Sequence, residues 1–386
     1  MKPVIKLAFL DVGQGDTTII SCPDTQEAIV VDCVDSEAVI AYLERERIKH
    51  LRGVIITHLH ADHYKQTADL LYGCEKVVGT QGCEILATSE AVPKTYPPKR
   101  YPPDGDEHST AADLPLVGKG KRKTPSSLTS LSKLYNWCQK NQTKCQPFLD
   151  APNVANPIQG TLAQSLRIFH PPFSNYATLR ASGLNNVSVV IRIGDASGTG
   201  ASALLTGDLE PEGWAYLKEK YSGLESNILK FPHHGGTWRE AETDDLLTTV
   251  RPSAVIISVG SNNTFDHPRA EVFTSLKKRR NLRLLCTQAT DKCQLLVHKE
   301  RNSVITAFEG QIAKDRSFFL FPRENQCPCS GTVIIELRDT PQIVQPESVF
   351  HESLITAHYR NHQCSLLSVA SSTATSGEMT TGHTEG

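Results

Sequence analysis

The first sixty residues alternate between short apolar runs and turn signals. Four runs have the length and the β-branched content of buried strands: VIKLAFL (4–10), TTIIS (17–21), AIVVD (28–32) and GVIIT (53–57). The two glycines of DVGQGD mark a turn between the first two runs. Between the third and fourth runs, apolar positions recur at helical spacing from Ser36 to Arg47, and the serine is suited to cap the start of that helix. Strands that alternate with helices favour an α/β fold over an all-β sandwich.

The same alternation returns in the second half of the chain. Strands are expected at 165–170, 187–193, 201–206, 226–231 and 254–260, with helices at 211–221, 240–248 and 269–279 and short strands from there to about Phe308. Pro211 supports the start of the first of these helices, because proline is tolerated in a first turn. We therefore expect one layered α/β catalytic domain over residues 1–308.

Two stretches interrupt this pattern. Residues 91–160 are rich in proline and charge and contain one helix-like piece at 126–139, so we expect an insertion there. Residues 309–367 are expected to form a small C-terminal segment, and the Ser/Thr/Gly-rich residues 368–386 a disordered tail.

The insertion carries basic residues interleaved with tyrosines. Such a composition can bind single-stranded nucleic acid by charge pairing and stacking, or a protein partner, and it is also that of an ordinary solvated loop. The residues concerned are Lys94, Tyr96, Lys99, Arg100, Tyr101, Lys119, Lys121, Arg122 and Lys123.

Composition and charge exclude several broad classes. The net charge of -2 gives no global electrostatic case for nucleic acid or an anionic membrane. No apolar run approaches the ~18–20 residues that span a bilayer, and no signal-like region opens the chain, so a cytoplasmic protein without a membrane role is expected. The eleven cysteines include no CxxC pair, which favours reduced cysteines in the core over a disulfide framework.

The strongest chemical signal is the hexapeptide HLHADH directly after an apolar strand. It contains His58, His60, Asp62 and His63, and imidazole with carboxylate suits zinc while tolerating manganese. A turn there can direct the first two side chains at one metal and the last two at a second. A polar loop with three histidines by chance is the alternative, and the density of ligand types at a strand end makes it the weaker interpretation.

Two further motifs end apolar strands. Asp208 in LLTGD can bridge two cations, although alone it reads as an ordinary turn aspartate. His233 and His234 in LKFPHHGG are followed by two glycines, which allow close backbone approach. Neither motif is specific by itself.

The order of five motifs resembles that of a known family. DVGQGD, HLHADH, LLTGD, HHGG and SVGSNNTFDHP occur in the order found in the metallo-β-lactamase-type domain of the DNA-uptake channel protein ComEC and its stand-alone relatives. The resemblance covers about residues 4–296 apart from the insertion, and it implies a four-layer αβ/βα sandwich. It also implies that His58 and His60 hold a first metal and that Asp62 and His63 hold a second.

The resemblance assigns roles to further residues as well. Asp208 would bridge the two metals, His234 would be one more ligand, and His233 would contact substrate. His170 before Pro171 would complete the first metal, or else is a structural strand-end residue. His267 would bind substrate phosphate or protonate a leaving group, so the expected catalytic residues are Asp62, His233 and His267.

Supporting positions follow from the same comparison of motifs. Asp11, Asp16 and Asp32 would hold the histidine rings by hydrogen bonds. Asn185 and Asn186 would lie near the metals, or form a simple turn. Gly236 departs from the pattern, because relatives often carry serine there; this changes a substrate contact and removes no ligand.

A second, structural metal site is a separate hypothesis for the C-terminal segment. Cys327, Cys329, His351 and Cys364 supply the ligand types of a Cys₃His zinc site, but their spacing is irregular. Reduced core or surface cysteines are the alternative.

These observations predict a hydrolase that uses two divalent metal ions, zinc or manganese, and a metal-bridging hydroxide. Nothing in the motif spacing distinguishes phosphorus from carbonyl carbon as the centre attacked. The preference for a phosphodiesterase or nuclease rests on the resemblance. The alternatives are a hydrolase of a small ester, thioester or lactone, and a metal-binding regulatory module with low turnover.

Overall fold

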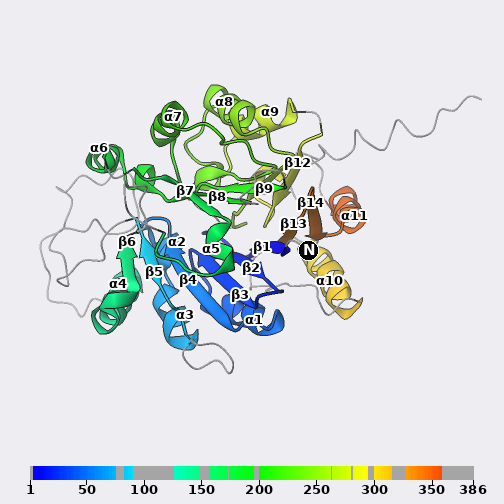
Figure 1. Ribbon diagram of the computed structural model, residues 1–386. Helices are drawn as coiled ribbons and strands as arrows, with labels where there is room; N and C mark the ends of the chain where they lie inside the picture. The colour runs from blue at the N-terminus through cyan, green and yellow to red at the C-terminus, as the bar shows by residue number, and fades with distance from the viewer. Residues whose placement is uncertain are drawn as a thin grey trace, which may run out of the picture.

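The computed structural model contains two mixed β-sheets packed face to face, with helices on both outer sides (Figure 1). It describes residues 3–74, 82–89, 126–147, 156–172, 174–194, 200–261, 263–279, 281–293, 300–314 and 327–358. The layers follow the order helix, sheet, sheet, helix, so the expected αβ/βα fold class is confirmed. Among the helices of these ranges, none combines the length and the apolar character needed to cross a membrane.

The first sheet has eight strands in the order β14-β13-β1-β2-β3-β4-β5-β6. The pairs from β3 to β6 are parallel and the remaining pairs are antiparallel. The strands are β1 (Ile5–Phe9), β2 (Thr18–Cys22), β3 (Glu27–Val31), β4 (His50–Ile56), β5 (Leu86–Thr88), β6 (Cys145–Pro147), β13 (Val333–Leu337) and β14 (Pro341–Gln345).

The second sheet has six strands in the order β12-β11-β10-β9-β8-β7. The pairs from β9 to β12 are parallel, so the carboxyl ends of these four strands lie at one edge. The strands are β7 (Leu166–His170), β8 (Val190–Gly194), β9 (Ser202–Leu205), β10 (Ile228–Lys230), β11 (Ala254–Ile257) and β12 (Arg283–Cys286).

Helices cover the outer face of each sheet. The first sheet is covered by α1 (Ser36–Arg45), α3 (Thr67–Cys74) and α4 (Ser126–Lys140), and the second by α7 (Pro211–Lys220), α8 (Glu240–Val250) and α9 (Ala270–Lys277). The other helices are α2 (Ala61–Tyr64), α5 (Thr161–Gln164), α6 (Tyr176–Ser182), α10 (Glu300–Lys314) and α11 (Ser348–His358), with short 3₁₀ turns η1 (Gln142–Lys144), η2 (Asn185–Val187), η3 (Pro232–Gly235) and η4 (Asp291–Cys293).

Three buried clusters explain this layering. Strand side chains alternate between the two faces of a sheet, so Leu7 and Phe9 of β1 pack between the sheets while Ala8 packs beneath the helices. Ile191 of β8 and Ile256 of β11 complete the middle cluster from the second sheet.

Two local expectations are wrong. Asp35, not Ser36, caps α1: its side chain accepts a hydrogen bond from the Ala38 N–H (3.1 Å). Residues 300–308 form the first part of α10 rather than short strands. Val304 and Phe308, four positions apart, are both buried, which is helical periodicity.

The C-terminal segment belongs to the first sheet. The expected boundary at residue 308 falls inside α10, and β13 pairs with β1 along its whole length, Ile5 opposite Leu337 and Phe9 opposite Val333. Two elements of the expected insertion belong to the same half of the fold. Helix α4 packs on α3, and β6 is the last strand of the first sheet, next to β5. The basic and tyrosine residues of the insertion, and the tail 368–386, lie outside the described residues.

Candidate metal centre

The HLHADH segment connects β4 to α2 and is held by the strand next to it. Asp32, directly after β3, adopts a left-handed conformation (φ 59°) and accepts hydrogen bonds from the Thr57 N–H (2.7 Å) and the Thr57 hydroxyl (2.8 Å). The same carboxylate lies 2.7 Å from Nδ1 of His63. Asp32 therefore fixes both the start of the loop and the orientation of its last histidine.

The DVGQGD turn packs directly on this loop. The Asp16 N–H donates to the Asp62 carbonyl (3.0 Å). Gly15 has a φ of +116°, and a Cβ there would press on the same carbonyl oxygen, so only glycine fits. The first motif thus positions the second.

The second sheet supplies its ligand types at the edge where its parallel strands end. Asp208 follows β9, and His233 and His234 follow the neighbouring strand β10. Both histidines have positive φ values (50° and 52°), a strained conformation for residues with a Cβ. Gly235 allows the close approach of Pro268, whose Cβ would be 2.6 Å from a Cβ at that position.

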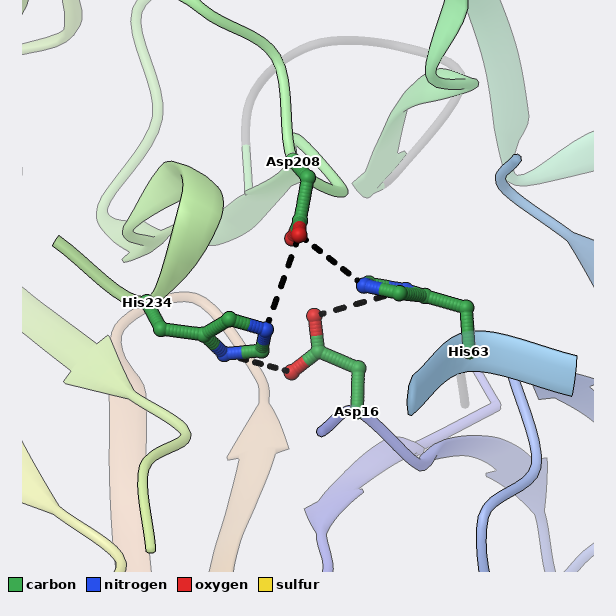
Figure 2. A group of neighbouring side chains, drawn as sticks. All are labelled: Asp16, His63, Asp208 and His234. Carbon is green, nitrogen blue, oxygen red and sulfur yellow. Dashed lines mark ion pairs between the residues drawn. The ribbon is translucent and has the colours of Figure 1, made fainter. Parts of the chain in front are cut away.

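Figure 2 shows that Asp208 and His234 meet His63 and Asp16 of the first sheet at one point. Asp208 Oδ2 lies 3.0 Å from His63 Nε2 and 3.6 Å from His234 Nε2. The Asp62 carboxylate lies 3.7 Å from His234 Nε2 and 4.0 Å from His63 Nε2, and it is partly exposed. Two imidazoles and two carboxylates thus face one another across a space that suits a cation.

The rings are oriented so that Nε2 is left for a ligand. Nδ1 of His63 faces Asp32, and Nδ1 of His234 donates to the Ser258 carbonyl (2.7 Å). His63 Nε2, His234 Nε2 and Asp208 Oδ1 are buried and have no hydrogen-bond partner among the described residues. Held Nδ1–H groups with Nε2 lone pairs directed at one point are the usual arrangement of metal-ligating histidines. The residues therefore fit a metal ion.

The electrostatics of the cluster favour positive charge at the same point. Burial alone would lower the pKa of His63, but the Asp208 and Asp32 carboxylates outweigh it and hold that pKa well above the ordinary histidine value. Burial likewise opposes a charged His234, and Asp208 and Asp16 raise its pKa. Burial would raise the pKa of Asp208, and the neighbouring His63 and His234 lower it well below the ordinary value.

His58 and His60 lie next to this point. His58 Nε2 is 3.0 Å from His60 Nδ1, and the rings of His58 and His63 are 4.2 Å apart. His58 is fully buried, and its Nδ1 is within reach of the hydroxyls of Thr57 (3.2 Å) and Ser188 (3.3 Å). Burial, with the nearby His63 and His60, holds the pKa of His58 well below its usual range, so the ring is neutral and its one unprotonated nitrogen can bind a metal.

Asp16 approaches the cluster from the opposite side of the rings. Ligand atoms of Asp16, His63, Asp208 and His234 all lie within 4.8 Å of one another. The Asp16 oxygens, however, face Nδ1 of His63 (4.0 Å) and Nδ1 of His234 (3.9 Å), and one of them forms an ion pair with Lys230 Nζ. Because its charge is already paired, Asp16 supports the rings rather than competing with Asp62 for the Nε2 side.

Sequence reasoning missed Lys230. The side chain is 3% exposed, it ends β10, and its Nζ also lies 3.4 Å from the Gly207 carbonyl. The sequence contains a signal for this residue: Lys230 lies in the predicted buried strand SNILKF, and a buried lysine requires a partner of opposite charge.

Asp11 is placed one step further from the centre. It accepts a hydrogen bond from Gln288 Nε2 (2.6 Å), and its N–H donates to the Thr332 hydroxyl (3.1 Å). These contacts tie the first motif to the strands β12 and β13.

The two asparagines and His170 form a neighbouring layer. Asn185 Nδ2 donates to Glu210 (3.0 Å) and lies 3.5 Å from His233 Nε2. Asn186 accepts from the Gly213 N–H (3.0 Å) through its side chain. His170 Nε2 lies 2.7 Å from the Asn186 carbonyl. The ligand role that the motif resemblance implies for His170 stays a prediction.

His233 and His267 lie beside the centre. His233 Nε2 is 4.0 Å from Asp208 Oδ2, and its ring is 5.1 Å from that of His267. Burial, together with His233 and His234, lowers the pKa of His267 to about 3, so its imidazole is neutral near pH 7. Gly236 leaves room for this ring, since a Cβ there would be 2.6 Å from His267 Nε2.

The second predicted metal site is only partly described. Cys329 Sγ and the Ser330 hydroxyl lie 3.6 and 3.1 Å from His351 Nε2. Cys327, Cys329 and His351 do not form a three-ligand group within the described ranges, and Cys364 lies outside them. The buried Cys327 and Cys329 pack in the core of the second sheet.

Comparisons with known proteins agree with the fold and the motifs. The model of the metallo-beta-lactamase superfamily matches residues 10–80. ComE operon protein 3 of Bacillus subtilis (strain 168) is 22% identical over 321 residues, which cover 77% of this chain and 33% of that protein. Competence protein ComA of Neisseria gonorrhoeae is 32% identical over 111 residues, which cover 28% of this chain and 15% of that protein. The chain thus spans a third or less of the length of these relatives.

Two solved structures are similar at low sequence identity. The metallo-beta-lactamase fold protein YhfI from Bacillus subtilis has a TM-score of 0.35 and 13% identity, with 70% of this chain and 93% of that chain covered. A metallo-beta-lactamase from Staphylococcus aureus subsp. aureus COL has a TM-score of 0.30 and 11% identity, with 74% and 55% covered.

The chain is thus similar to the metallo-β-lactamase superfamily over residues 10–80, within an α/β fold of two mixed sheets flanked by helices. It is distantly similar to ComE operon protein 3 and to competence protein ComA, and it has a buried His/Asp cluster of metal-binding character.

Proposed function

We propose that the protein is a metal-dependent hydrolase of phosphodiesters, acting on nucleotides or nucleic acid. The observation that carries this is the convergence of His63 Nε2, His234 Nε2 and Asp208 at one buried point, while protein acceptors hold both Nδ1 atoms. Buried polar atoms are normally hydrogen-bonded, so buried ligand atoms without a hydrogen bond at one point support a site that binds a metal ion.

The side chains divide into two neighbouring ligand sets. Asp62, His63, Asp208 and His234 would hold one divalent ion, and His58 and His60 would hold the other next to it, with Asp208 shared. Two bound divalent ions, zinc or manganese, would supply activation of water near neutral pH and neutralisation of charge on the transferring oxygens.

The remaining residues would bind and orient the substrate. His233 is held by Glu210, whose Oε1 lies 3.5 Å from its Nδ1, so its Nε2 points toward Asp208. A neutral His267 offers one N–H to a non-reacting oxygen of the substrate. Trp238, fully buried, donates to the Leu209 carbonyl (3.2 Å) and fixes the turn that carries Asp208.

Two features support a phosphodiester over a carbonyl substrate. The five-motif resemblance is to the DNA-uptake branch, and one of the relatives is named competence protein ComA. In addition, burial is the main cause of the lowered pKa of His267, and the charge of the exposed Arg269 also contributes to it, so a cation lies near that imidazole and can attract an anionic substrate.

The test combines metal analysis with a panel of substrates. The purified protein is expected to bind about two equivalents of zinc or manganese and to hydrolyse bis-p-nitrophenyl phosphate, but not lactam or thioester reporters. Asp208→Asn should abolish turnover, and Asp69→Asn, at an exposed pair with Lys133, should not. Full metal occupancy with turnover of the lactam or thioester reporter alone, or with no turnover of any substrate, would reject the phosphodiesterase proposal.

A further inference from the structure

An exposed aromatic ring stands on the loop that carries His267. Phe265 is 55% exposed. Among the described residues, three large hydrophobic side chains are exposed, and Phe265 is aromatic whereas Val344 and Val349 are not. A single exposed apolar residue is common on protein surfaces and by itself needs no function. Phe265 differs from such a residue in its position next to the metal centre and in the hydrogen bonds that hold its loop.

The ring continues a row of rings that starts at the metal centre. The His267 ring lies 6.3 Å from that of His234, with 22° between the planes. The Phe265 ring lies 5.7 Å from that of His267, with 32° between the planes. The row leads from a candidate ligand, through a candidate substrate-binding histidine, to a ring exposed to solvent.

The loop is held rigidly on both sides of the ring. Asn263 Nδ2 donates to the carbonyls of Gly260 and His267 (both 2.9 Å), and its Oδ1 accepts from the His267 N–H (3.0 Å). Asp266 is left-handed (φ 61°), and its carboxylate pairs with Lys292 (2.6 Å). Because the backbone is fixed, little loop entropy would be lost when a flat group binds to the ring.

The charges around the ring indicate which flat group would bind. Asp266, next to the ring, is paired with Lys292 and is also within reach of the charge of the exposed Arg269, so two cations act on one carboxylate there. A quaternary ammonium group would be repelled here, and it normally requires several aromatic faces. A nucleobase has a neutral π-face and is attached to a phosphate that Arg269 can attract.

We propose that Phe265 is a stacking platform for a nucleobase of the substrate, so that the protein favours phosphodiesters of nucleosides over those without a base. This proposal rests on the proposed function, because it assigns a binding site to the base that neighbours the cleaved phosphodiester. Stacking of one base on an aromatic side chain changes affinity by on the order of 10-fold.

The platform can be tested without turnover. Binding of 2-aminopurine deoxyriboside 5′-monophosphate is followed by its fluorescence, which stacking quenches. Wild type and Phe265→Trp should quench the probe, and Phe265→Ala should bind it about 10-fold more weakly with little quenching. Val349→Ala removes an exposed apolar side chain elsewhere (78% exposed) and should behave as wild type. Equal affinity and quenching in Phe265→Ala and wild type would overturn the platform.

A kinetic test separates this proposal from the proposed function. The substrates are thymidylyl-(3′,5′)-thymidine and an analogue in which tetrahydrofuran replaces both bases. Phe265→Ala should raise KM for the base-bearing substrate about 10-fold more than for the abasic one, with rescue by Phe265→Trp. Equal effects on both substrates would reject the base subsite while leaving the phosphodiesterase in place. Failure to hydrolyse either substrate would reject the phosphodiesterase, and the fluorescence result would still decide the platform.

Discussion

Lys230 and Asp16 form a buried ion pair that joins the two sheets beneath the metal centre. Asp16 belongs to the turn before β2 of the first sheet, and Lys230 ends β10 of the second. Burial would lower the pKa of Lys230, but Asp16 and Asp208 outweigh it and raise that pKa, so the ammonium stays charged. The pair thus provides one fixed positive charge among the carboxylates that surround the metals.

Replacement of this lysine should be costly. Lys230→Met leaves the Asp16 carboxylate buried and unpaired, which is expected to reduce the free energy of unfolding by about 3–5 kcal/mol. Urea denaturation measures the change. The double variant Lys230→Met/Asp16→Asn should recover part of the loss, because the uncompensated charge is gone.

The matched control for that variant is Lys218→Met. Lys218 pairs with Asp245 at the surface, where both side chains are about two-fifths exposed (42% and 41%). Such a pair contributes about 0–1 kcal/mol. A loss as small for Lys230→Met as for Lys218→Met would contradict the role given to the buried pair.

Asp32 should control metal affinity without being a ligand. Asp32→Asn keeps an oxygen near Thr57 but removes the negative charge that orients His63, and we expect affinity for zinc to fall by about 10–100-fold. Competition with a coloured chelator measures this. Asp35→Asn, at the cap of α1, is the control from the same segment and should leave the affinity unchanged.

Metal binding should stabilise the fold through His234. At a free metal concentration about 1,000 times the dissociation constant, bound metal adds about 4 kcal/mol to the free energy of unfolding. Thermal denaturation with and without a chelator should show this in the wild type and show far less in His234→Ala. Equal chelator effects in the two proteins would remove His234 from the ligand set.

Gly236 should be a determinant of substrate affinity rather than of metal binding. In Gly236→Ala the new Cβ would meet His267 Nε2 at 2.6 Å and force that ring to shift. We expect KM for bis-p-nitrophenyl phosphate to rise while the metal content stays at the wild-type level. Gly310→Ala is the control, since a Cβ there meets nothing within 4 Å.

Much of this arrangement could be predicted from the sequence because ligand types follow apolar strands. HLHADH, LLTGD and HHGG each end a strand, and parallel strands present their ends at one edge of a sheet. What the sequence could not give is the orientation of side chains. Asp16 meets the Nδ1 side of His63 because Asp32 orients that ring, and it meets the Nδ1 side of His234 because the Ser258 carbonyl orients that ring; both contacts are distant along the chain.

The sequence was misread at residues 300–308, and it could not show the non-local pairing of β13. Residues 300–308 have short apolar groups that resemble strands, and only the burial of Val304 with Phe308 shows the helix. β13 reads as an isolated strand in the sequence, since its partner β1 lies more than three hundred residues earlier.

The pairing of β1 with β13 also affects how this protein folds during its synthesis on the ribosome. As the chain emerges, β1 can pair at once with β2, but its other edge stays open until residues 333–337 have been translated. The nascent chain therefore carries an unprotected strand edge through most of its synthesis, and closure of that edge is a late, slow event because the partners are so distant in sequence. Truncated products that end before β13 should be prone to aggregation and dependent on chaperones, even though every residue of the candidate metal centre between the two sheets has already been made.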